Sequence, residues 1–412
     1  MSEQDRTQVN IQNRSTNNNP KVWKAYWMGK GQSWRTEPEI DVNRQAYLDE
    51  RRKIKTGWMN GVFPFKDIEL NRADVEWLLA THENGRGPID WSDESQRERK
   101  GLDLLGANLV EVDMDMLPLT RAILTGAHLE RASLHSAKLE GVDLTGAYLE
   151  GTRLSYARLY RALLIEAHLN GADLNWAFLA GADLSRAYFD GETKLNGAEL
   201  SDNEYGGASL VDIHWDGVNL AVVDWLRIST LGHERKARIP TFCGALGETI
   251  KNKNDHLKEY QTAVRAYRQL AVALQGQALN EEAAKFAYRA QLLKRKVYWY
   301  GGIRKFGRYL FLLFLDLLAG YGYKPWRSFA AYLIVILGFA IAYFFIGQTV
   351  GPFLSPVGSV VFSMTSFHGR GFFPGGIKLD DPLTILAAFE AFGGLLIEVV
   401  FIATLTRRLF EK

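Results

Sequence analysis

The sequence predicts a multidomain membrane protein, in which a solenoid and a helical hairpin precede two membrane-spanning helices. Large apolar residues recur every five positions between residues 104 and 225, which matches neither the helical nor the strand period. A short fixed period of this kind indicates a solenoid. Two apolar runs, residues 328–346 and 382–406, are each about long enough to cross a ~30 Å hydrocarbon core.

Composition sets the limits for this prediction. The chain has 412 residues, of which 47% are apolar and 23% charged, values typical of a folded protein of two or three domains. Residues 101–225 hold 19 acidic and 8 basic residues, whereas residues 226–332 hold 7 and 19. The basic part precedes the membrane, where anionic headgroups favour Lys and Arg. The single cysteine, Cys243, rules out an intrachain disulfide and a cysteine metal cluster.

The first hundred residues form a tail and a cap. Residues 1–20 are polar and rich in Asn, lack the apolar core of a signal peptide, and are expected to be disordered. Residues 21–101 mix helix and loop signals. Within them Val75, Leu78 and Leu79 have helical spacing, so we expect a short helix that covers the first coil of the solenoid.

The repeat region covers residues 102–225. Large apolar residues recur every five positions from Leu104 to Phe189, and a small residue, most often Ala, stands two positions before most of them. One extra residue in the stretch 191–195 shifts this frame. The expected inward positions after the shift are Leu195, Leu200, Tyr205, Leu210, Trp215, Leu220 and Trp225.

Two stretches of this region, Gly171-Ala-Asp-Leu-Asn175 and Gly181-Ala-Asp-Leu-Ser185, resemble the units of the pentapeptide-repeat family. The resemblance implies a right-handed quadrilateral β-helix with four pentads in a coil, Leu or Phe on the axis and Ala beside it. The chain's twenty-five pentads would then make about six coils and a rod ~30 Å long at the strand spacing. Such a motif is specific for fold and says little about function.

Three histidines, His128, His135 and His168, fall in outward slots of the predicted β-helix. We interpret them as solvated surface residues, with a metal site as the alternative. The acidic exterior is similar to that of family members that mimic DNA and bind topoisomerases. Two membrane spans argue against a soluble DNA mimic here, and we expect no nucleic-acid partner.

Residues 226–254 are a basic connector, and residues 255–298 are a helical hairpin, broken at Gly276 and capped at Asn280. The hairpin is similar to one tetratricopeptide-type pair. One repeat cannot bury its own faces, so we expect it to pack on the solenoid or on a neighbouring subunit, with a plain connector as the alternative. Residues 299–327 interleave aromatic and basic side chains, which indicates an interfacial helix at residues 306–318.

The last segment, residues 328–412, has the order span, short apolar helix, Gly-x-Gly, span. It resembles the two-transmembrane pore-loop channels of bacteria, which are potassium-channel-like tetramers. The expected elements are a first span at 328–346, a pore helix at 356–364, a filter at 365–371 and a second span at 382–406. Ser355 and Pro356 begin the pore helix as cap and first residue.

Basic residues fix the expected orientation. Lys and Arg cluster before the first span and after the second, whereas only Arg370 and Lys378 lie between them. By the positive-inside rule both termini are cytoplasmic, and the loop faces outward. We therefore expect a multi-pass protein of the plasma (inner) membrane whose solenoid lies in the cytosol.

The resemblance implies a set of pore and selectivity residues, among which Gly369 and Gly371 would turn backbone carbonyls toward an axis. The whole set is Thr365, Ser366, Phe367, His368, Gly369, Arg370, Gly371, Glu390 and Glu398.

Arg370 and Phe372 depart from the family's potassium filter, where an aromatic residue and an Asp stand. If Arg370 faces the axis of a narrow pore, it repels cations. If it points behind the filter, as the family's aromatic residue does, it needs a carboxylate partner, and Glu390 is our first candidate. Potassium selectivity, weak selectivity and anion conduction all stay open. Glu398 lies ~12 Å deeper and is expected to line the pore, with a buried structural pair as the alternative. For Gly393 and Gly394 we favour close helix packing over a hinge.

We therefore predict an oligomeric, tetrameric ion channel with a cytosolic regulatory or docking domain. Its partners would be further copies of itself, the lipid bilayer, permeant ions, and a cytosolic protein or ligand at the β-helix. No phosphate loop, nucleophile elbow or metal-ligand spacing is visible, so we expect no enzyme activity, cofactor or metal. The alternative is a non-conducting, membrane-anchored scaffold whose acidic β-helix binds a protein.

Overall fold

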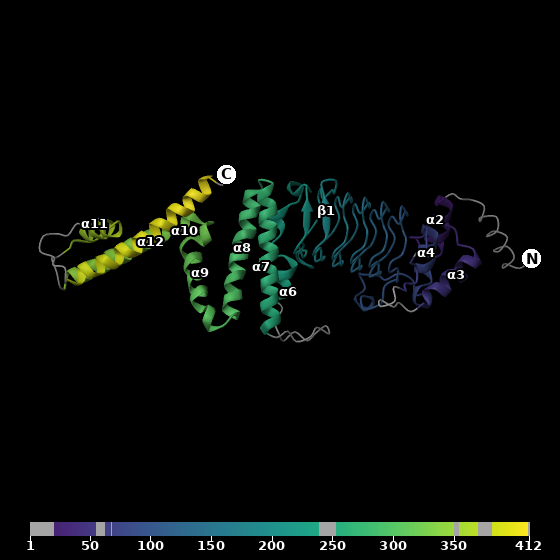
Figure 1. The fold of residues 1–412 in the computed structure, drawn as a ribbon, viewed down its shortest axis with the longest axis horizontal. Coiled ribbons are helices and arrows are strands. Elements are labelled where there is room, and N and C mark those ends of the chain that lie inside the picture. The colour runs from purple at the N-terminus through teal and green to yellow at the C-terminus, as the bar shows by residue number, and fades with distance from the viewer. Residues whose placement is uncertain are drawn as a thin grey trace, which may run out of the picture. The chain divides into compact units, whose positions relative to one another are not determined.

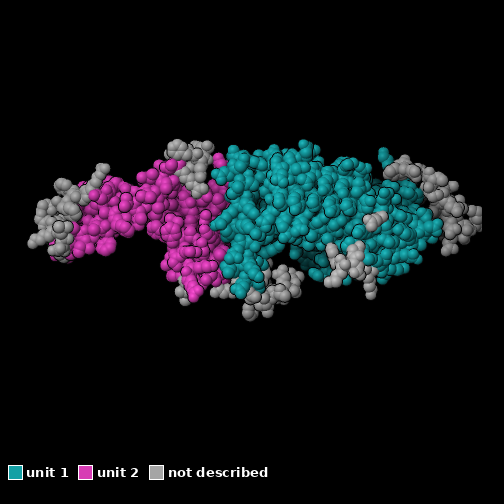
Figure 2. All heavy atoms as spheres, viewed as in Figure 1, with its two compact units in different colours: residues 1–279 teal, residues 280–412 magenta. Residues whose placement is uncertain are grey.

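The computed structural model describes residues 20–54, 62–66, 68–238, 253–349, 354–369 and 381–410. The tail expected at residues 1–20 therefore lies almost wholly outside the described residues. The chain divides into two compact units, residues 1–279 and residues 280–412, which Figure 2 colours teal and magenta. The division falls between the two helices of the predicted hairpin, so each unit is described by itself.

Unit 1 begins with a helical cap, drawn in purple and blue in Figure 1. Its elements are α2 (Pro20–Gly29), α3 (Val42–Arg52), α4 (Arg72–Ala80), α5 (His82–Gly85) and the 3-10 turn η2 (Glu94–Gln96). The helix α4 lies where the apolar spacing indicates a helix, and Val75, Leu78 and Leu79 are buried. Asn71 and Asp74 form a reciprocal capping box that satisfies its first backbone donors.

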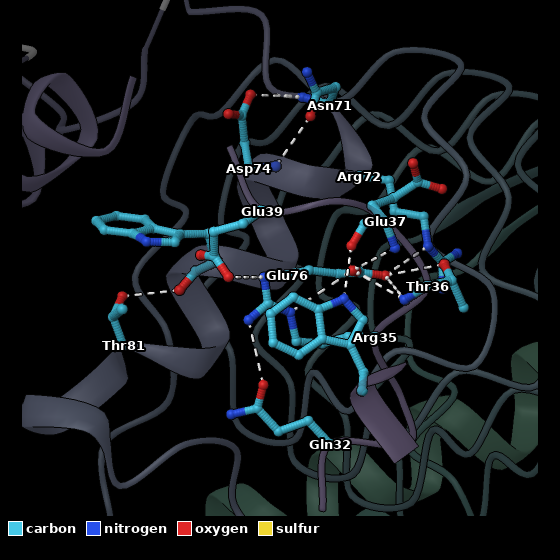
Figure 3. A network of polar contacts seen from close by, with 12 residues as sticks. Gln32, Arg35, Thr36, Glu37, Glu39, Asn71, Arg72, Asp74, Glu76 and Thr81 are labelled. Atoms are coloured by element: carbon cyan, nitrogen blue, oxygen red, sulfur yellow. Dashed lines mark hydrogen bonds and ion pairs between the residues drawn. The ribbon is translucent and has the colours of Figure 1, made fainter. Parts of the chain in front are cut away.

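A buried carboxylate joins separate parts of this cap to one another (Figure 3). Glu76 of α4 accepts hydrogen bonds from the backbone N–H groups of Thr36 and Glu37, at 2.9 and 3.0 Å. Its Oε1 also lies 2.9 Å from Nε of Arg72. The same guanidinium reaches Asp113 in the repeat region at 3.1 Å. Arg72 therefore pairs with a carboxylate on each side, which stabilises the end of the solenoid.

The repeat region coils with a period of twenty residues. Parallel bridges join positions that are four pentads apart, as in Asp103 with Ile123 and His168 with Tyr188. The Leu or Phe of each pentad is buried throughout the regular coils. Continuous strand is short, since only β1 (Tyr188–Asp190) and β2 (His214–Asp216) extend beyond single bridges, and they pair in parallel. Four pentads in a coil is the count that a quadrilateral β-helix requires.

The predicted shift of the five-residue frame after residue 190 is confirmed, and a second break in the twenty-residue period of the coil follows it. Asp173 pairs with Lys194, twenty-one positions on, because of the extra residue in the stretch 191–195. Asp183 pairs with Ser209, twenty-six positions on, so one further pentad leaves the coil. We expected Tyr205 on the axis, and this was wrong.

Tyr205 lies in a loop that leaves the coil and returns to it. An antiparallel bridge between Ser201 and Gly207 closes the loop. The carboxylate of Asp202 accepts from the backbone N–H groups of Tyr205 and Gly206, at 2.6 and 3.2 Å. Gly206 takes a left-handed φ of 78°, which glycine adopts without strain. These local hydrogen bonds stabilise the loop, so Tyr205 does not enter the axis even though it falls at the next position of the five-residue period.

Two of the three outward histidines, His128 and His168, belong to a column of stacked rings, and His135 meets the ring of Tyr156 edge to face. His128, Tyr148, His168, Tyr188 and His214 form one continuous column of stacked rings. Successive ring centroids lie 4.7, 5.1, 4.9 and 4.5 Å apart. The spacing follows from the strand separation, because bridged positions place their side chains in register. Among the described residues no group of three or more His, Cys, Asp or Glu can hold a metal ion.

The C-terminal end of the solenoid is covered by helices rather than by a plain connector. They are η3 (Leu220–Val222), η4 (Trp225–Arg227), α6 (Gly232–Arg238) and α7 (Lys253–Gly276). Tyr267 of α7 donates to the buried Glu234 of α6 at 2.6 Å and accepts from the backbone of Leu231. Gln269 donates to Asp212 of the solenoid at 2.7 Å. The first helix of the predicted hairpin therefore packs on the solenoid.

The described elements of unit 2 are all helices joined by short connections, shown green to yellow in Figure 1. Its elements are α8 (Asn280–Tyr300), η5 (Ile303–Lys305), α9 (Phe306–Ala319), η6 (Gly320–Gly322), α10 (Pro325–Gly347), α11 (Pro356–Phe367) and α12 (Pro382–Phe410). Short α11 packs against both α10 and α12. The helix α9 occupies the stretch expected to be interfacial and packs against α8 and α10.

Candidate functional site

The candidate site lies in unit 2, where α11 packs between two long apolar helices. Residues 326–347 of α10 and 382–406 of α12 are long and apolar enough to cross a membrane, with mean hydropathies of 2.5 and 2.2. The twelve residues of α11 span only ~18 Å, too short for a ~30 Å hydrocarbon core. Ser355 caps α11 through its hydroxyl, and Pro356 is its first residue, as the sequence indicates.

The helix α11 continues three residues beyond the predicted pore helix and ends at Phe367. Thr365, Ser366 and Phe367 are therefore helical, and the predicted boundary that placed them after the pore helix, in the filter, was wrong. The Thr365 hydroxyl donates to the carbonyl groups of Val361 and Phe362, at 3.1 and 2.9 Å, which is how threonine is accommodated within a helix. Ser366 and Phe367 are buried, so packing also favours the longer helix.

The chain leaves α11 through His368 and Gly369. The Gly369 N–H donates to the Ser366 carbonyl at 2.9 Å, and Gly369 takes a left-handed φ of 67°. Glycine is the residue that adopts this conformation readily, so the freedom expected of Gly369 is used here. Arg370 and Gly371, and with them Phe372, lie outside the described residues.

Glu390 of α12 is fully buried and joins three helices. Its Oε2 accepts from the hydroxyl of Tyr343 in α10 at 2.6 Å, and its Oε1 lies 2.5 Å from the hydroxyl of Ser363 in α11. The Ser363 hydroxyl also lies 2.9 Å from the Ile336 carbonyl of α10. Both carboxylate oxygens therefore have hydroxyl partners, whereas Arg370, the partner expected from the sequence, lies outside the described residues.

Sequence reasoning missed Tyr343 and Ser363. A signal for Ser363 was present, because Ser359, Ser363 and Ser366 recur at helical spacing in α11, and all three are buried. No comparable signal marked Tyr343, since a tyrosine in an apolar run also suits a membrane interface.

Gly394 lies at a close approach between α11 and α12. A Cβ atom added to Gly394 would lie 2.2 Å from the carbonyl oxygen of Phe367 and 3.0 Å from its ring. A Cβ on the adjacent Gly393 would meet no atom within 4 Å. Gly394 therefore serves close packing, which the sequence favoured over a hinge.

Glu398 lies two turns beyond Glu390 and faces the end of α11. Its Oε1 is 3.4 Å from Nε2 of His368, and both side chains are more than a third exposed. The structure thus brings together His368 and Glu398, and separately Glu390, Ser363 and Tyr343. Two of the predicted site residues, Arg370 and Gly371, are not placed.

Most of the spans' apolar surface is uncovered. Within the unit only 17% and 22% of the two spans are buried. Large side chains such as Ile334, Phe345, Phe389 and Phe392 are more than 60% exposed. An exposed apolar surface of this size requires lipid or further protein around it.

The fold and the site define a repeat solenoid joined to a helical segment with two candidate membrane spans. The family model described as pentapeptide repeats, in eight copies, matches residues 119–151, 143–179 and 164–202. The chain is a pentapeptide-repeat protein. No curated protein matches the chain.

Solved structures of pentapeptide-repeat proteins also resemble the chain. HetL from the cyanobacterium Nostoc sp. strain PCC 7120, involved in heterocyst differentiation regulation, is 28% identical over 29% of this chain and 60% of its own, with a TM-score of 0.21. The relative from the Arabidopsis thaliana thylakoid lumen is 29% identical over 25% and 64%, with a TM-score of 0.17. Rfr23 from Cyanothece 51142 is 32% identical over 31% and 88%, with a TM-score of 0.18.

The chain thus spans less than two thirds of HetL and of the thylakoid protein. All three TM-scores are below 0.5, so the family assignment rests on the repeat model. The residues that the family model matches, 119–202, lie within the solenoid, and none of them is in unit 2.

Proposed function

We propose that this protein is an oligomeric, tetrameric ion channel of the plasma membrane with a cytosolic pentapeptide-repeat domain. The observation that carries the proposal is the packing of α11 against both candidate spans. A capped apolar helix too short to cross a membrane needs walls of protein at membrane depth. A membrane anchor needs only the spans.

The end of α11 is suited to a pore. A helix C-terminus carries a partial negative charge from its free carbonyl groups, which favours a nearby cation. The chain leaves this end through the left-handed Gly369, so the residues that follow start from the helix terminus. Filters of pore-loop channels are built from backbone carbonyl groups in such a segment.

The outer surfaces of α10 and α12 support assembly. Their exposed apolar side chains must be covered by lipid or by further copies of the chain. A pore on a symmetry axis requires several copies, each of which contributes one α11. A tetramer is the number that the resemblance to bacterial pore-loop channels implies. Both termini would be cytoplasmic, so unit 1 would lie in the cytosol.

A regulatory or docking role is proposed for unit 1. A cavity of about 580 Å³ lies between the cap and the repeat region, within the usual size range of small-ligand sites. Its lining combines the rings of Trp34, Trp91 and Tyr205 with the charged groups of Lys138 and Glu140. A ligand held there would contact both the cap and the solenoid.

Ion flux through purified protein tests this proposal. Full-length protein is reconstituted into liposomes that contain a high concentration of KCl, and fluxes of K⁺, Na⁺ and Cl⁻ are compared with those of empty liposomes. Flux above the empty control, together with a tetrameric mass in detergent, is expected. A monomeric protein with no flux for any of the three ions would favour the membrane-anchored scaffold instead.

A further inference from the structure

The cavity between the cap and the repeat region has two adjacent cations in its lining, Lys138 and Arg158. They occupy the same position of the pentad on neighbouring coils, and a parallel bridge joins their backbones. Bridged positions place their side chains in register, about 4.8 Å apart. Like charges directly opposite each other destabilise a sheet, so this pair costs stability unless an anion lies beside it.

The buried Glu140 compensates only part of this charge. Its Oε1 forms an ion pair with Nε of Arg158 at 2.9 Å, and its Oε2 accepts from the Thr120 hydroxyl at 3.0 Å. Both carboxylate oxygens are therefore engaged at the floor of the cavity. Within the described part of the chain, the Lys138 ammonium and the Nη groups of Arg158 have no hydrogen-bond partner.

Two further carboxylates of the lining, Asp90 and Glu204, lie at its exposed rim. Asp90 accepts from the backbone N–H and the hydroxyl of Ser92, at 3.0 and 2.7 Å. These hydrogen bonds lower the pKa of Asp90, and the charge of Lys138 also contributes. Burial raises the pKa of Tyr205, and its hydrogen bond with Glu204 raises it further. Both rim carboxylates thus have neighbours of their own, and the two bridged cations remain as donors for a ligand.

Aromatic rings lie beside these cations. The Arg158 guanidinium is 5.9 Å from the ring centroid of Tyr160, and the Tyr160 ring is 5.1 Å from that of Tyr205. The Tyr205 hydroxyl accepts from Nε1 of Trp91 at 3.3 Å, which joins the inserted loop to the cap. The break in the repeat therefore supplies one ring to the lining, and the cap supplies others.

We propose that this cavity binds a small organic anion with a planar ring, whose carboxylate or phosphate oxygens are held by Lys138 and Arg158. A guanidinium matches the geometry of such an oxyanion, and hydrogen bonds between charged groups are shorter and stronger than neutral ones. The ring of the ligand packs against Trp91 and Tyr205, in an offset or edge-to-face arrangement. The proposal rests on the proposed function in one respect, since it gives the regulatory role of unit 1 a class of ligand.

Equilibrium dialysis of full-length protein in detergent tests the site without ion flux. Labelled benzoate and adenosine monophosphate each carry a ring and an oxyanion, whereas adenosine carries only the ring and inorganic phosphate only the oxyanion. We expect benzoate or adenosine monophosphate to bind at least about tenfold more tightly than adenosine and phosphate. The tighter of the two identifies the oxyanion as carboxylate or phosphate. No binding of either ring-bearing anion up to about 10 mM, or phosphate binding as tight as both, would overturn the proposal.

Lys138→Gln is the diagnostic variant, because it removes the charge and keeps most of the side chain. Affinity for the bound probe should fall about tenfold or more. The midpoint of chemical unfolding should stay equal or rise, since the repulsion from Arg158 is relieved. A merely structural lysine would show the opposite pattern.

Lys194→Gln is the matched control. Lys194 holds the same position of its pentad, but the bridged residue on the neighbouring coil is Asp173, which carries the opposite charge. This variant should bind the probe as the unmodified protein does, and its unfolding midpoint should not rise. Equal affinities in Lys138→Gln and Lys194→Gln, or a midpoint that falls in Lys138→Gln, would contradict the role given to Lys138.

Ion flux into liposomes with and without the bound probe separates this proposal from the proposed function. A saturating concentration of the probe should change the flux through the unmodified protein, and the same concentration should have less effect on Lys138→Gln. If the probe binds but the protein does not conduct, the anion site stands and the channel proposal fails. Flux that a bound probe leaves unchanged would overturn the regulatory role of the site.

Discussion

At the scale of single residues, the adjacent glycines Gly393 and Gly394 allow a matched comparison, because an added Cβ meets neighbouring atoms only at Gly394. Gly394→Ala would place a Cβ 2.2 Å from the Phe367 carbonyl, so α11 must move away from α12. Overpacking of this kind costs about 1–3 kcal/mol. Gly393→Ala meets no atom within 4 Å and should be neutral or stabilising.

Thermal unfolding of the two purified variants in detergent checks this expectation. The midpoint for Gly394→Ala should fall below that of the unmodified protein, whereas that for Gly393→Ala should equal or exceed it. Equal midpoints for the two variants would mean that α11 and α12 do not approach each other at Gly394.

A second prediction at this scale concerns how the stability of unit 1 depends on pH. Burial lowers the pKa of His233, in α6, from 6.5 to about 4, so the folded state keeps this imidazole neutral. Between these two values the unfolded chain binds a proton that the folded chain does not. The stability contributed by His233 is therefore complete above about pH 6.5 and is lost as the pH falls toward 4, by at most about 3 kcal/mol.

Asp183 contributes in the same direction but at lower pH, because its stabilisation is present above the ordinary pKa of 3.8 and is lost as the pH falls through its lowered folded pKa. Burial acts to raise its pKa, but the ion pair with Lys236 and the hydrogen bond from Ser185 outweigh burial and lower it. We expect the midpoint of chemical unfolding of unit 1 to drop between pH 7 and pH 4.5, and the drop to be smaller in His233→Gln. His128→Gln, on the exposed ring column, is the control. An identical drop in both variants would contradict the burial of His233.

The site residues illustrate what the sequence could predict at this scale. Gly369 was predicted because few other residues adopt its left-handed φ, and Ser355 because caps have a strong residue preference. The helical conformation of Thr365 and Ser366 was not predicted, because their polar side chains are as compatible with a filter as with a helix. Their burial against neighbouring helices, which decides the matter, is a tertiary property.

At the scale of elements, one carboxylate joins three helices of unit 2. Asp316 of α9 pairs with Arg295 of α8 at 2.8 Å and with Arg327 of α10 at 3.2 Å. It also accepts from the hydroxyl of Tyr288 in α8 at 3.0 Å. Asp316→Asn leaves two half-buried guanidinium groups without a carboxylate, which should cost about 2 kcal/mol. Tyr288→Phe removes one neutral donor and should cost about 1 kcal/mol or less.

Limited proteolysis measures this effect at the junctions of α8, α9 and α10. Cleavage near η5 and η6 should be faster in Asp316→Asn than in Tyr288→Phe. Equal cleavage rates for Asp316→Asn and the unmodified protein would mean that this carboxylate does not hold the three helices together.

In unit 1, Arg72 connects the cap to the solenoid in a similar way. Its side chain is 13% exposed, and its guanidinium lies between Glu76 and Asp113, whereas the Arg86 side chain is 66% exposed and pairs with Glu83. Arg72→Ala leaves the buried Glu76 short of one cation and should destabilise the cap by about 2–3 kcal/mol. Arg86→Ala should change stability by less than about 0.5 kcal/mol. Hydrogen exchange of α4 distinguishes the two variants, and equal protection would contradict the role given to Arg72.

The solenoid shows where element-level reasoning succeeds and where it stops. A period of five over many repeats determines which side chains are buried, and the extra residue at 191–195 is visible as a break. The loop at residues 201–207 was missed because Tyr205 continues the period. Asp202 and Gly206 were the available signals, since Asp and Gly favour turns, but the apolar pattern received more weight.

At the scale of the whole molecule, the order of segments was predictable because each has its own period or length. A five-residue repeat, helical spacing and long apolar runs seldom occur in one another's place. None of these patterns predicts what the segments do together. The repeats determine a fold and leave the function to the segments joined to it.

The central claim, that unit 2 forms an ion-conducting pore, is tested most directly by single-channel recording. Purified full-length protein is incorporated into planar bilayers with asymmetric KCl. The account predicts discrete current steps whose reversal potential reports the preferred ion, together with weaker or absent steps in Gly394→Ala. Bilayers that contain the protein and pass no current under any salt, voltage or stretch would contradict it.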